Sequence, residues 1–178
     1  MKLLDMTRKY GGATYAYPFE PYEVPENFRG KPNYDYAKCI GCTACAVACP
    51  SNAINVKLNK TGTKLVWEFD CGRCIYCGRC DEVCPTNAVF LSHEFETAVK
   101  FNKDDLKVRG ELEVEYCHVC KKPYTTKRLI AYDIERLKNV GWSTEGFDAK
   151  VEHLYTCPEC KKKKAVEQAC HYFIRSNK

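Results

Sequence analysis

The sequence lacks several features that define common protein classes. It contains no run of about 18 apolar residues, and residues 1–10 have no long apolar stretch, which excludes a membrane-spanning helix and argues against secretion. The glycine-rich loops G-x-G-x-x-G and G-x4-G-K-[ST] are both missing, so these nucleotide-binding loops are excluded. No Ser/His/Asp set or carboxylate pair marks a place where a substrate would react. We therefore expect no catalytic residues and no enzymatic activity of this chain on its own.

Cysteine, in contrast, is frequent, with 14 residues in a chain of 178. In a secreted protein this share would indicate a disulfide scaffold. Because the chain shows no signal peptide, we expect instead a reducing, cytoplasmic location in which metal ions hold the thiolates. The length allows one domain or two small ones.

Two cysteine runs organise the chain, one from Cys39 to Pro50 and one from Cys74 to Pro85. Each reads C-x2-C-x2-C-x3-C-P, the spacing that binds a [4Fe–4S] cluster, and in two-cluster ferredoxins the fourth cysteine of each run ligates the other cluster. Structural thiols or zinc at the C-x2-C pairs are the alternative, but zinc knuckles need no such dense run followed by proline. The pattern assigns Cys39, Cys42, Cys45 and Cys84 to one cluster, here cluster I, and Cys74, Cys77, Cys80 and Cys49 to cluster II.

The two runs belong to an internal repeat with an offset of 35 residues. Residues 39–54 and 74–89 are identical at eight of sixteen positions. Each half is expected to contain a cluster loop, a short helix and a strand, the strands lying at 53–57 and 88–91. The sequence thus predicts an α+β protein with a bacterial-type 2[4Fe–4S] ferredoxin fold.

A hairpin is predicted between the two halves, because turn residues separate alternating runs at 54–58 and 64–69. Trp67 in the second run is expected to pack inside the protein. We place the ferredoxin-like domain at 39–100 and a connection at 92–110. Since the core of this domain would be mostly inorganic, loss of the clusters is expected to unfold it. The apolar residues expected to shield the clusters are Ile40, Val47, Ile75 and Val83.

Residues 1–38 are predicted to form an extended N-terminal arm. Four prolines between positions 18 and 32 disfavour a regular helix and favour extended or polyproline II backbone. The aromatic residues of this segment have few local partners, which suits an arm that lies across another subunit. The alternative is an arm that wraps its own ferredoxin domain. These aromatic residues are Tyr15, Tyr17, Phe19, Tyr22 and Phe28.

Residues 101–178 are predicted to form a small C-terminal metal-binding module. Two C-x2-C knuckles with 36 residues between them supply four thiolates, which can enclose a tetrahedral metal. We expect Zn²⁺, with a single iron as the alternative because the knuckles also resemble those of rubredoxins. The predicted ligands are Cys117, Cys120, Cys157 and Cys160.

Two helices are predicted in this module, at 126–140 and at about 163–175. Two cysteines remain outside the ligand sets. Cys71 precedes a run that is already complete and is expected to be a packed thiol near cluster II, and Cys170 is expected to be buried in the last helix. His118 lies inside a knuckle, but the neighbouring cysteines have better spacing for zinc.

The formal net charge of +5 does not indicate a nucleic-acid partner. Two [4Fe–4S] clusters and one zinc ion, each with four thiolates, contribute about −2 apiece and bring the charge to about −1. No clear basic stripe interleaved with aromatic residues is present. We expect no nucleic-acid binding.

Several segments together resemble the ferredoxin-type subunit family of formate hydrogenlyase and hydrogenase-4, which is also called component H or subunit 6. The two-cluster subunit of respiratory complex I is similar more distantly and shares Phe-Arg-Gly at 28–30. The segments that carry the first resemblance are YPFEP at 17–21, NFRGKP at 27–32, the two cysteine runs through Ala53 and Ala88, WEF at 67–69 and LSHEFE at 91–96.

This resemblance implies a role in electron transfer. The subunit would relay electrons between a donor and the small subunit of a membrane-bound group 4 [NiFe]-hydrogenase, with the large subunit also in the complex. The donor would be formate dehydrogenase, CO dehydrogenase or a ferredoxin. The resemblance places the chain peripherally on the cytoplasmic face of the membrane. A freely diffusing 2[4Fe–4S] ferredoxin is the alternative, although such a carrier needs neither the arm nor the third metal.

Overall fold

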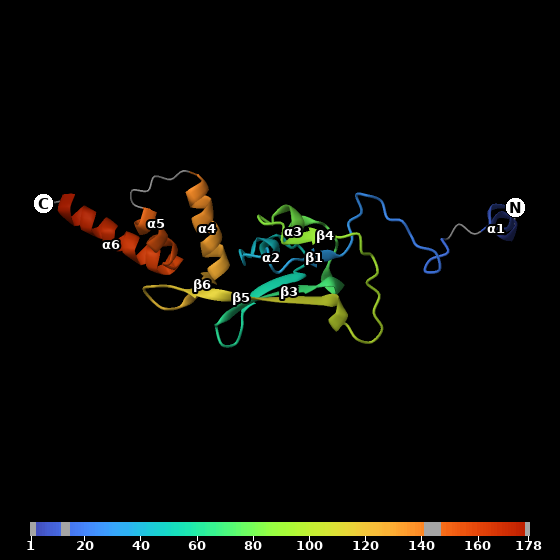
Figure 1. The fold of residues 1–178 in the computed structure, drawn as a ribbon, viewed down its shortest axis with the longest axis horizontal. Coiled ribbons are helices and arrows are strands. Elements are labelled where there is room, and N and C mark those ends of the chain that lie inside the picture. The colour runs from blue at the N-terminus through green and yellow to red at the C-terminus, as the bar shows by residue number, and fades with distance from the viewer. Residues whose placement is uncertain (1–2, 12–14, 141–146, 177–178) are drawn as a thin grey trace.

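The computed structural model describes residues 3–11, 15–140 and 147–176 and is elongated (Figure 1). The ferredoxin-like part lies in the middle, with helix α1 beyond one end and helices α5 and α6 beyond the other. In chain order the elements are α1 (Leu3–Tyr10), β1 (Pro32–Tyr34), α2 (Ala44–Ala48), β2 (Ile54–Leu58), β3 (Lys64–Asp70), the 3₁₀ helix η1 (Cys71–Arg73), α3 (Arg79–Glu82), β4 (Val89–Leu91), the 3₁₀ helix η2 (Asp104–Leu106), β5 (Lys107–Tyr116), β6 (Pro123–Thr126), α4 (Lys127–Asn139), α5 (Phe147–Leu154) and α6 (Pro158–Ser176).

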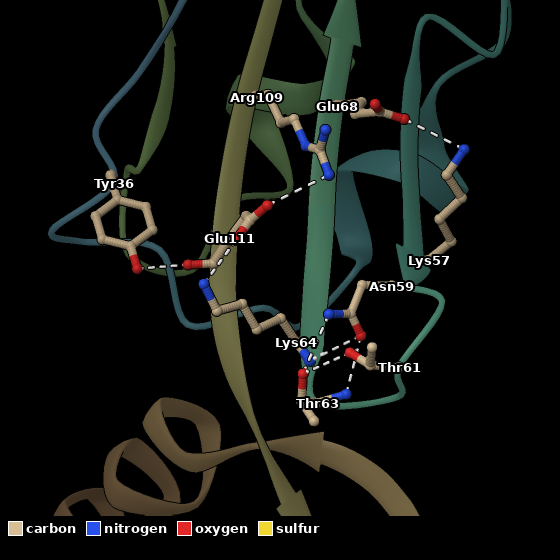
Figure 2. Close-up of polar contacts among 9 residues, drawn as sticks. All are labelled: Tyr36, Lys57, Asn59, Thr61, Thr63, Lys64, Glu68, Arg109 and Glu111. Carbon is tan, nitrogen blue, oxygen red and sulfur yellow. Dashed lines mark hydrogen bonds and ion pairs between the residues drawn. The ribbon is translucent and has the colours of Figure 1, made fainter.

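An antiparallel four-stranded sheet with the order β2-β3-β5-β6 supports the ferredoxin-like part. Strands β2 and β3 form the hairpin that the sequence predicts between the two halves of the repeat, which confirms that prediction. The side-chain oxygen of Asn59 closes the turn by accepting backbone N–H bonds from Thr63 at 2.9 Å and Lys64 at 3.1 Å (Figure 2). An asparagine that satisfies nearby backbone donors in this way favours a turn over continued strand.

Charged side chains on this sheet connect neighbouring strands (Figure 2). Lys57 on β2 lies 3.3 Å from Glu68 on β3, and Lys64 on β3 lies 2.8 Å from Glu111 on β5. The Lys64 ammonium lowers the pKa of Glu111. All four side chains are substantially exposed, so water and salt screen these pairs and they contribute little to stability. The sheet is therefore held mainly by its backbone pairing and by its buried face.

Strand β5 adds to the sheet of the hairpin although it lies after residue 100, where a domain boundary is predicted from the sequence. It pairs with β3 from Lys64 opposite Glu113 to Asp70 opposite Lys107. Residues 107–110, which were expected to belong to a connection, are therefore part of a strand. The boundary at residue 100 stays a prediction, but the C-terminal segment begins as a strand of the same sheet as the hairpin.

Gly110 lies within β5 for a steric reason. It sits opposite Trp67 in the sheet, and the ring of Tyr34 covers this position. A Cβ atom at Gly110 would lie 2.6 Å from Cε1 of Tyr34, closer than real side chains approach one another. Glycine ordinarily weakens a strand, but here it allows an aromatic ring to approach the backbone.

The end of the arm is part of the ferredoxin-like domain. Strand β1 pairs antiparallel with β4, the strand of the second repeat half, so β2 and β4 lie in different sheets. Residues 15–29 contain mostly exposed side chains, and the ring of Phe19 is 92% exposed. Other aromatic rings of this segment contact Phe95, among them Tyr22 at 5.9 Å and Phe28 at 6.2 Å between ring centroids. The arm thus packs partly on its own domain around Phe95 and leaves other aromatic surface open, such as that of Phe19.

The C-terminal helices follow β6. The helix predicted at 126–140 is α4, and the Thr126 side chain caps it by accepting the Leu129 backbone N–H at 3.1 Å. Helix α6 begins at Pro158, five residues earlier than the predicted start near 163, and α5 was not expected. Within the described residues, no helix is long and apolar enough to cross a membrane.

We predict that Gly110→Val destabilises the protein by about 1–3 kcal/mol, the usual result of overpacking, because the new side chain must displace the Tyr34 ring. Denaturant unfolding of the anaerobically prepared protein measures this. Arg109→Ala, which changes the neighbouring exposed residue of β5, is the matched control and should have little effect. Equal stability of Gly110→Val and the unmodified protein would contradict this account of the strand.

Candidate metal centres

The four thiols that the sequence assigns to cluster I line one small cavity. Cys42 lies in the loop before α2, Cys45 lies within α2, and Cys84 follows α3 in the other half of the repeat. The wall is otherwise largely apolar and includes Val56 and Leu112. The complete thiol set of this cavity is Cys39, Cys42, Cys45 and Cys84.

The other four thiols line a second small cavity. Three of them belong to the second run, and Cys49 comes from the first run. The apolar residues Ile54 and Phe69 form part of the wall. The complete set is Cys49, Cys74, Cys77 and Cys80. Each cavity therefore combines three thiols from one half of the repeat with one from the other half.

Hydrogen-bond donors point at the thiols in a repeated arrangement. The backbone N–H of Ala53 donates to Cys49 Sγ at 3.2 Å, and that of Ala88 donates to Cys84 Sγ at 3.1 Å. These two pairs are equivalent positions of the repeat. Burial raises the pKa of Cys84, but hydrogen bonds from Val89, Thr86 and Ala88 outweigh it and lower the pKa below its ordinary value. Such donors suit a sulfur that carries negative charge, as a metal-bound thiolate does.

The more deeply buried thiols have raised pKa values instead. Burial raises the pKa of Cys80 to about 11, and it also raises that of Cys45. A buried thiol of this kind ionises only when a positive partner compensates the charge, and a bound metal supplies that partner with release of a proton. The donor set of each cavity, four thiols with N–H groups directed at sulfur, fits a [4Fe–4S] cluster.

The start of α4 packs on the loop of the first cavity. The Thr126 hydroxyl is fully buried and donates to the Ile40 carbonyl, while the Arg128 guanidinium donates to the carbonyls of Tyr36 and Cys39. Gly41 has a φ of 75°, and a Cβ there would lie 2.5 Å from Cγ2 of Thr126. Sequence reasoning missed this contact, because no local pattern links residue 40 to residue 126.

A third group of thiols is brought together by the two knuckles. Their Sγ atoms all lie within 4.8 Å of one another, and Cys120 Sγ lies 3.7 Å from Cys157 Sγ. A tetrahedral site with Zn–S bonds of about 2.3 Å has sulfur–sulfur edges of about 3.8 Å, so the spacing fits. Burial raises the pKa of Cys117, but backbone N–H groups outweigh it and lower the pKa to about 6. The four residues are Cys117, Cys120, Cys157 and Cys160.

Other expectations about single residues have mixed outcomes. Trp67 is 3% exposed, which confirms that it packs inside the protein, and Cys71 is buried with its Sγ 3.2 Å from the Tyr76 hydroxyl. Ile40 lines the first cavity and Ile75 lines the second, as a shielding role requires, whereas Val47 is 85% exposed and lines neither, so that expectation is wrong for Val47. Cys170 is also exposed, because no element in the described part of the chain covers its position on α6. His118 stacks on Tyr155 instead of joining the thiols.

Comparison with known proteins identifies the family. A family model described as a 4Fe-4S dicluster domain matches residues 38–88. The chain is 47% identical over 158 residues to formate hydrogenlyase subunit 6 of Escherichia coli (strain K12), covering 89% of this chain and 86% of that protein. The chain belongs to the formate hydrogenlyase subunit 6 family. As a member of this subunit 6 family it is an iron–sulfur electron-transfer subunit.

More distant relatives match smaller parts of the chain. It is 39% identical over 57 residues to NAD(P)H-quinone oxidoreductase subunit I of Nostoc sp. (strain PCC 7120), which is 32% of this chain and 25% of that protein. A chain in the structure of the membrane-bound sulfane sulfur reductase, an archaeal respiratory membrane complex, has 30% identity and a TM-score of 0.43, covering 57% of this chain and 56% of that one.

We predict that Cys157→Ser lowers the content of the third metal by about one ion per chain, since a hydroxyl is a poorer ligand than a thiolate. Elemental analysis of the anaerobic protein gives both the amount and the identity of the metal. Cys170→Ser, which changes an exposed thiol outside all three groups, is the matched control. Unchanged metal content in Cys157→Ser would contradict a site at the knuckles. Loss of a rubredoxin-like visible band in that variant would establish iron in place of zinc.

Proposed function

We propose that this chain is the electron-relay subunit of a membrane-bound complex that contains a group 4 [NiFe]-hydrogenase and is related to respiratory complex I. The observation that carries the proposal is the pair of four-thiol cavities within one small domain. Two such centres side by side give an electron an entry and an exit. On its own the chain is not an enzyme, and its task is to pass electrons to the hydrogenase small subunit.

The proposed cofactors are two [4Fe–4S] clusters and one zinc ion. The cavity sets support the ligand assignment, with Cys84 completing cluster I and Cys49 completing cluster II. The residues of the chain supply thiolate ligands, N–H donors and an apolar wall, while the clusters supply the redox chemistry. The close thiol group at the knuckles supports the third metal, which we assign a structural role because four thiolates leave no open position.

The proposed location is the cytoplasmic face of the membrane, where the chain is a peripheral subunit. The large and small subunits of the hydrogenase and an electron donor protein are the proposed partners, the donor being formate dehydrogenase, CO dehydrogenase or a ferredoxin. The arm supports this assembly, since residues 15–29 carry exposed aromatic side chains such as Phe19. Exposed aromatic groups are typical of segments that another subunit covers.

We predict that Cys45→Ala and Cys80→Ala each block electron flow, because each removes a ligand from a different cluster. Hydrogen evolution by the isolated complex measures the flow, and the iron content and EPR spectrum of the same samples show which cluster is lost. Cys71→Ala removes a buried thiol outside both sets and is the control that should keep both EPR signals. Two intact cluster signals in either ligand variant would overturn the assignment.

We predict that the chain co-purifies with hydrogenase subunits in gentle detergent and that Phe19→Asp weakens this association by at least about tenfold, since a carboxylate at an apolar contact must lose its water. Phe101→Asp is the matched control, because Phe101 is similarly exposed, at 97%, but lies outside the arm. The iron content of both variants should equal that of the unmodified chain. A native chain that runs alone at its own mass would instead support a freely diffusing ferredoxin.

A further inference from the structure

The indole of Trp67 contacts a ligand thiol of the first cavity directly. Its ring is 3% exposed, and its N–H donates to Cys45 Sγ at 3.4 Å. The indole has one polar hydrogen, and a buried indole normally directs it to an acceptor. In this protein the acceptor is a sulfur of the set proposed for cluster I, so Trp67 does more than fill the core.

Tyr34 places a second aromatic donor beside the same cavity. Its ring stacks on Trp67 with the centroids 3.9 Å apart and the planes 7° from parallel, and it also packs against Cys39. The buried Tyr34 hydroxyl has no hydrogen-bond partner among the described residues. A buried hydroxyl without a partner is costly and requires an explanation. An anionic sulfur at Cys39 would provide the missing acceptor.

Three elements far apart in the sequence position this pair. Strand β1 holds Tyr34 through its pairing with β4, β3 holds Trp67, and Gly110 on β5 leaves the room that the Tyr34 ring occupies. Such an arrangement fixes the direction of the Trp67 N–H and the position of the Tyr34 hydroxyl oxygen, whose hydrogen can rotate toward an acceptor. The rings are therefore pre-organised toward the thiols, which is the requirement for a group that tunes a metal centre.

We propose that Tyr34 and Trp67 are positioning residues that raise the reduction potential of cluster I by donating hydrogen bonds to its cysteine sulfurs. The inference rests on the proposed ligation of cluster I by the first cavity. Reduction adds an electron to the cluster and increases the negative charge on its sulfurs, so a hydrogen bond to sulfur is stronger in the reduced state. The donors favour reduction for this reason.

The internal repeat makes the effect specific to one cluster. Cys80 is the equivalent of Cys45 in the second half, and in the described part of the chain it receives no side-chain hydrogen bond. The other side-chain donors are matched, since the Ser51 hydroxyl lies 3.7 Å from Cys49 Sγ and the Thr86 hydroxyl lies 3.8 Å from Cys84 Sγ. Cluster II is thus an internal reference within the same molecule.

The test is an EPR-monitored redox titration of the anaerobically purified complex carrying Trp67→Phe or Tyr34→Phe. Each change keeps an aromatic ring and removes one polar hydrogen. We expect each to lower the equilibrium constant for one-electron reduction of cluster I by about tenfold, which equals about 59 mV. The midpoint of cluster II should not move. Tyr116→Phe, which removes a hydroxyl on β5 that is directed at Gly62, is the matched control and should leave both midpoints unchanged.

A second readout detects the hydrogen bond itself. In deuterated buffer, electron–nuclear double resonance of the reduced cluster I should show exchangeable hydrogens near the cluster, and each variant should lose one of these couplings. A purely structural role of the rings would not remove a single coupling. If both clusters are present but neither midpoint nor coupling changes in the two variants, or if both midpoints shift equally, the inference is overturned and the proposed function stands. If the unmodified complex lacks two clusters in this chain, both are overturned.

Discussion

In each cavity three thiols come from one half of the repeat and the fourth comes from the other half, so neither half encloses a cavity by itself. Cys84 closes the first cavity and Cys49 closes the second. This exchange forces the two loops to fold against each other. It also explains why a domain with so few large buried side chains has a defined interior. Burying thiols without a metal is unfavourable when their charge has no partner, so the fold and the cofactors depend on each other.

The C-terminal segment contacts the ferredoxin-like part in two ways. Strand β5 extends the hairpin sheet. At the start of α4, Thr126 and Arg128 donate hydrogen bonds to backbone carbonyls of the first cavity's loop. The first knuckle of the thiol group lies between β5 and β6, with Cys117 directly after β5 and Cys120 shortly before β6. A metal there would hold the base of α4, and α4 in turn holds the loop that contains Ile40. A metal at the knuckles would therefore stabilise the segment that packs on the first cavity.

The sequence predicts those parts of the structure that depend on local spacing. The cysteine runs, the hairpin and the capped helix α4 are each encoded within a short stretch, because ligand spacing, turn residues and capping act between near neighbours. The pairing of β1 with β4 and of β3 with β5 joins segments that are distant in the sequence, so local sequence patterns do not predict it. A glycine at position 110 indicates that another group approaches the backbone closely, but the sequence does not reveal that this group is the Tyr34 ring. Pro158 at the first position of α6 was a usable start signal that was missed.

The expectation for surface residues failed for a different reason. Val47 was expected to shield a cluster and Cys170 to be buried, because valine is apolar and a free cysteine is usually buried, yet apolar character does not reveal whether the covering surface belongs to the same chain. Val47 lies two residues from Cys45 of the first set and two from Cys49 of the second, and the exposed Ile75 directly follows Cys74. An electron-transfer subunit must leave at least one route to its centres open, and residues at such a route are apolar and exposed at once.

The residue at position 41 distinguishes the first cysteine loop of the repeat from the second. Its counterpart 35 residues later is Tyr76, which adopts a left-handed φ of 55° similar to the 75° of Gly41. The second loop has a large side chain at this point, whereas Thr126 fills the corresponding space at the first loop. The two loops are thus not interchangeable. In a chimera with two copies of the first loop, the space beside Thr126 would stay open to the glycine. In a chimera with two copies of the second loop, a tyrosine at position 41 would clash with Thr126 at the start of α4.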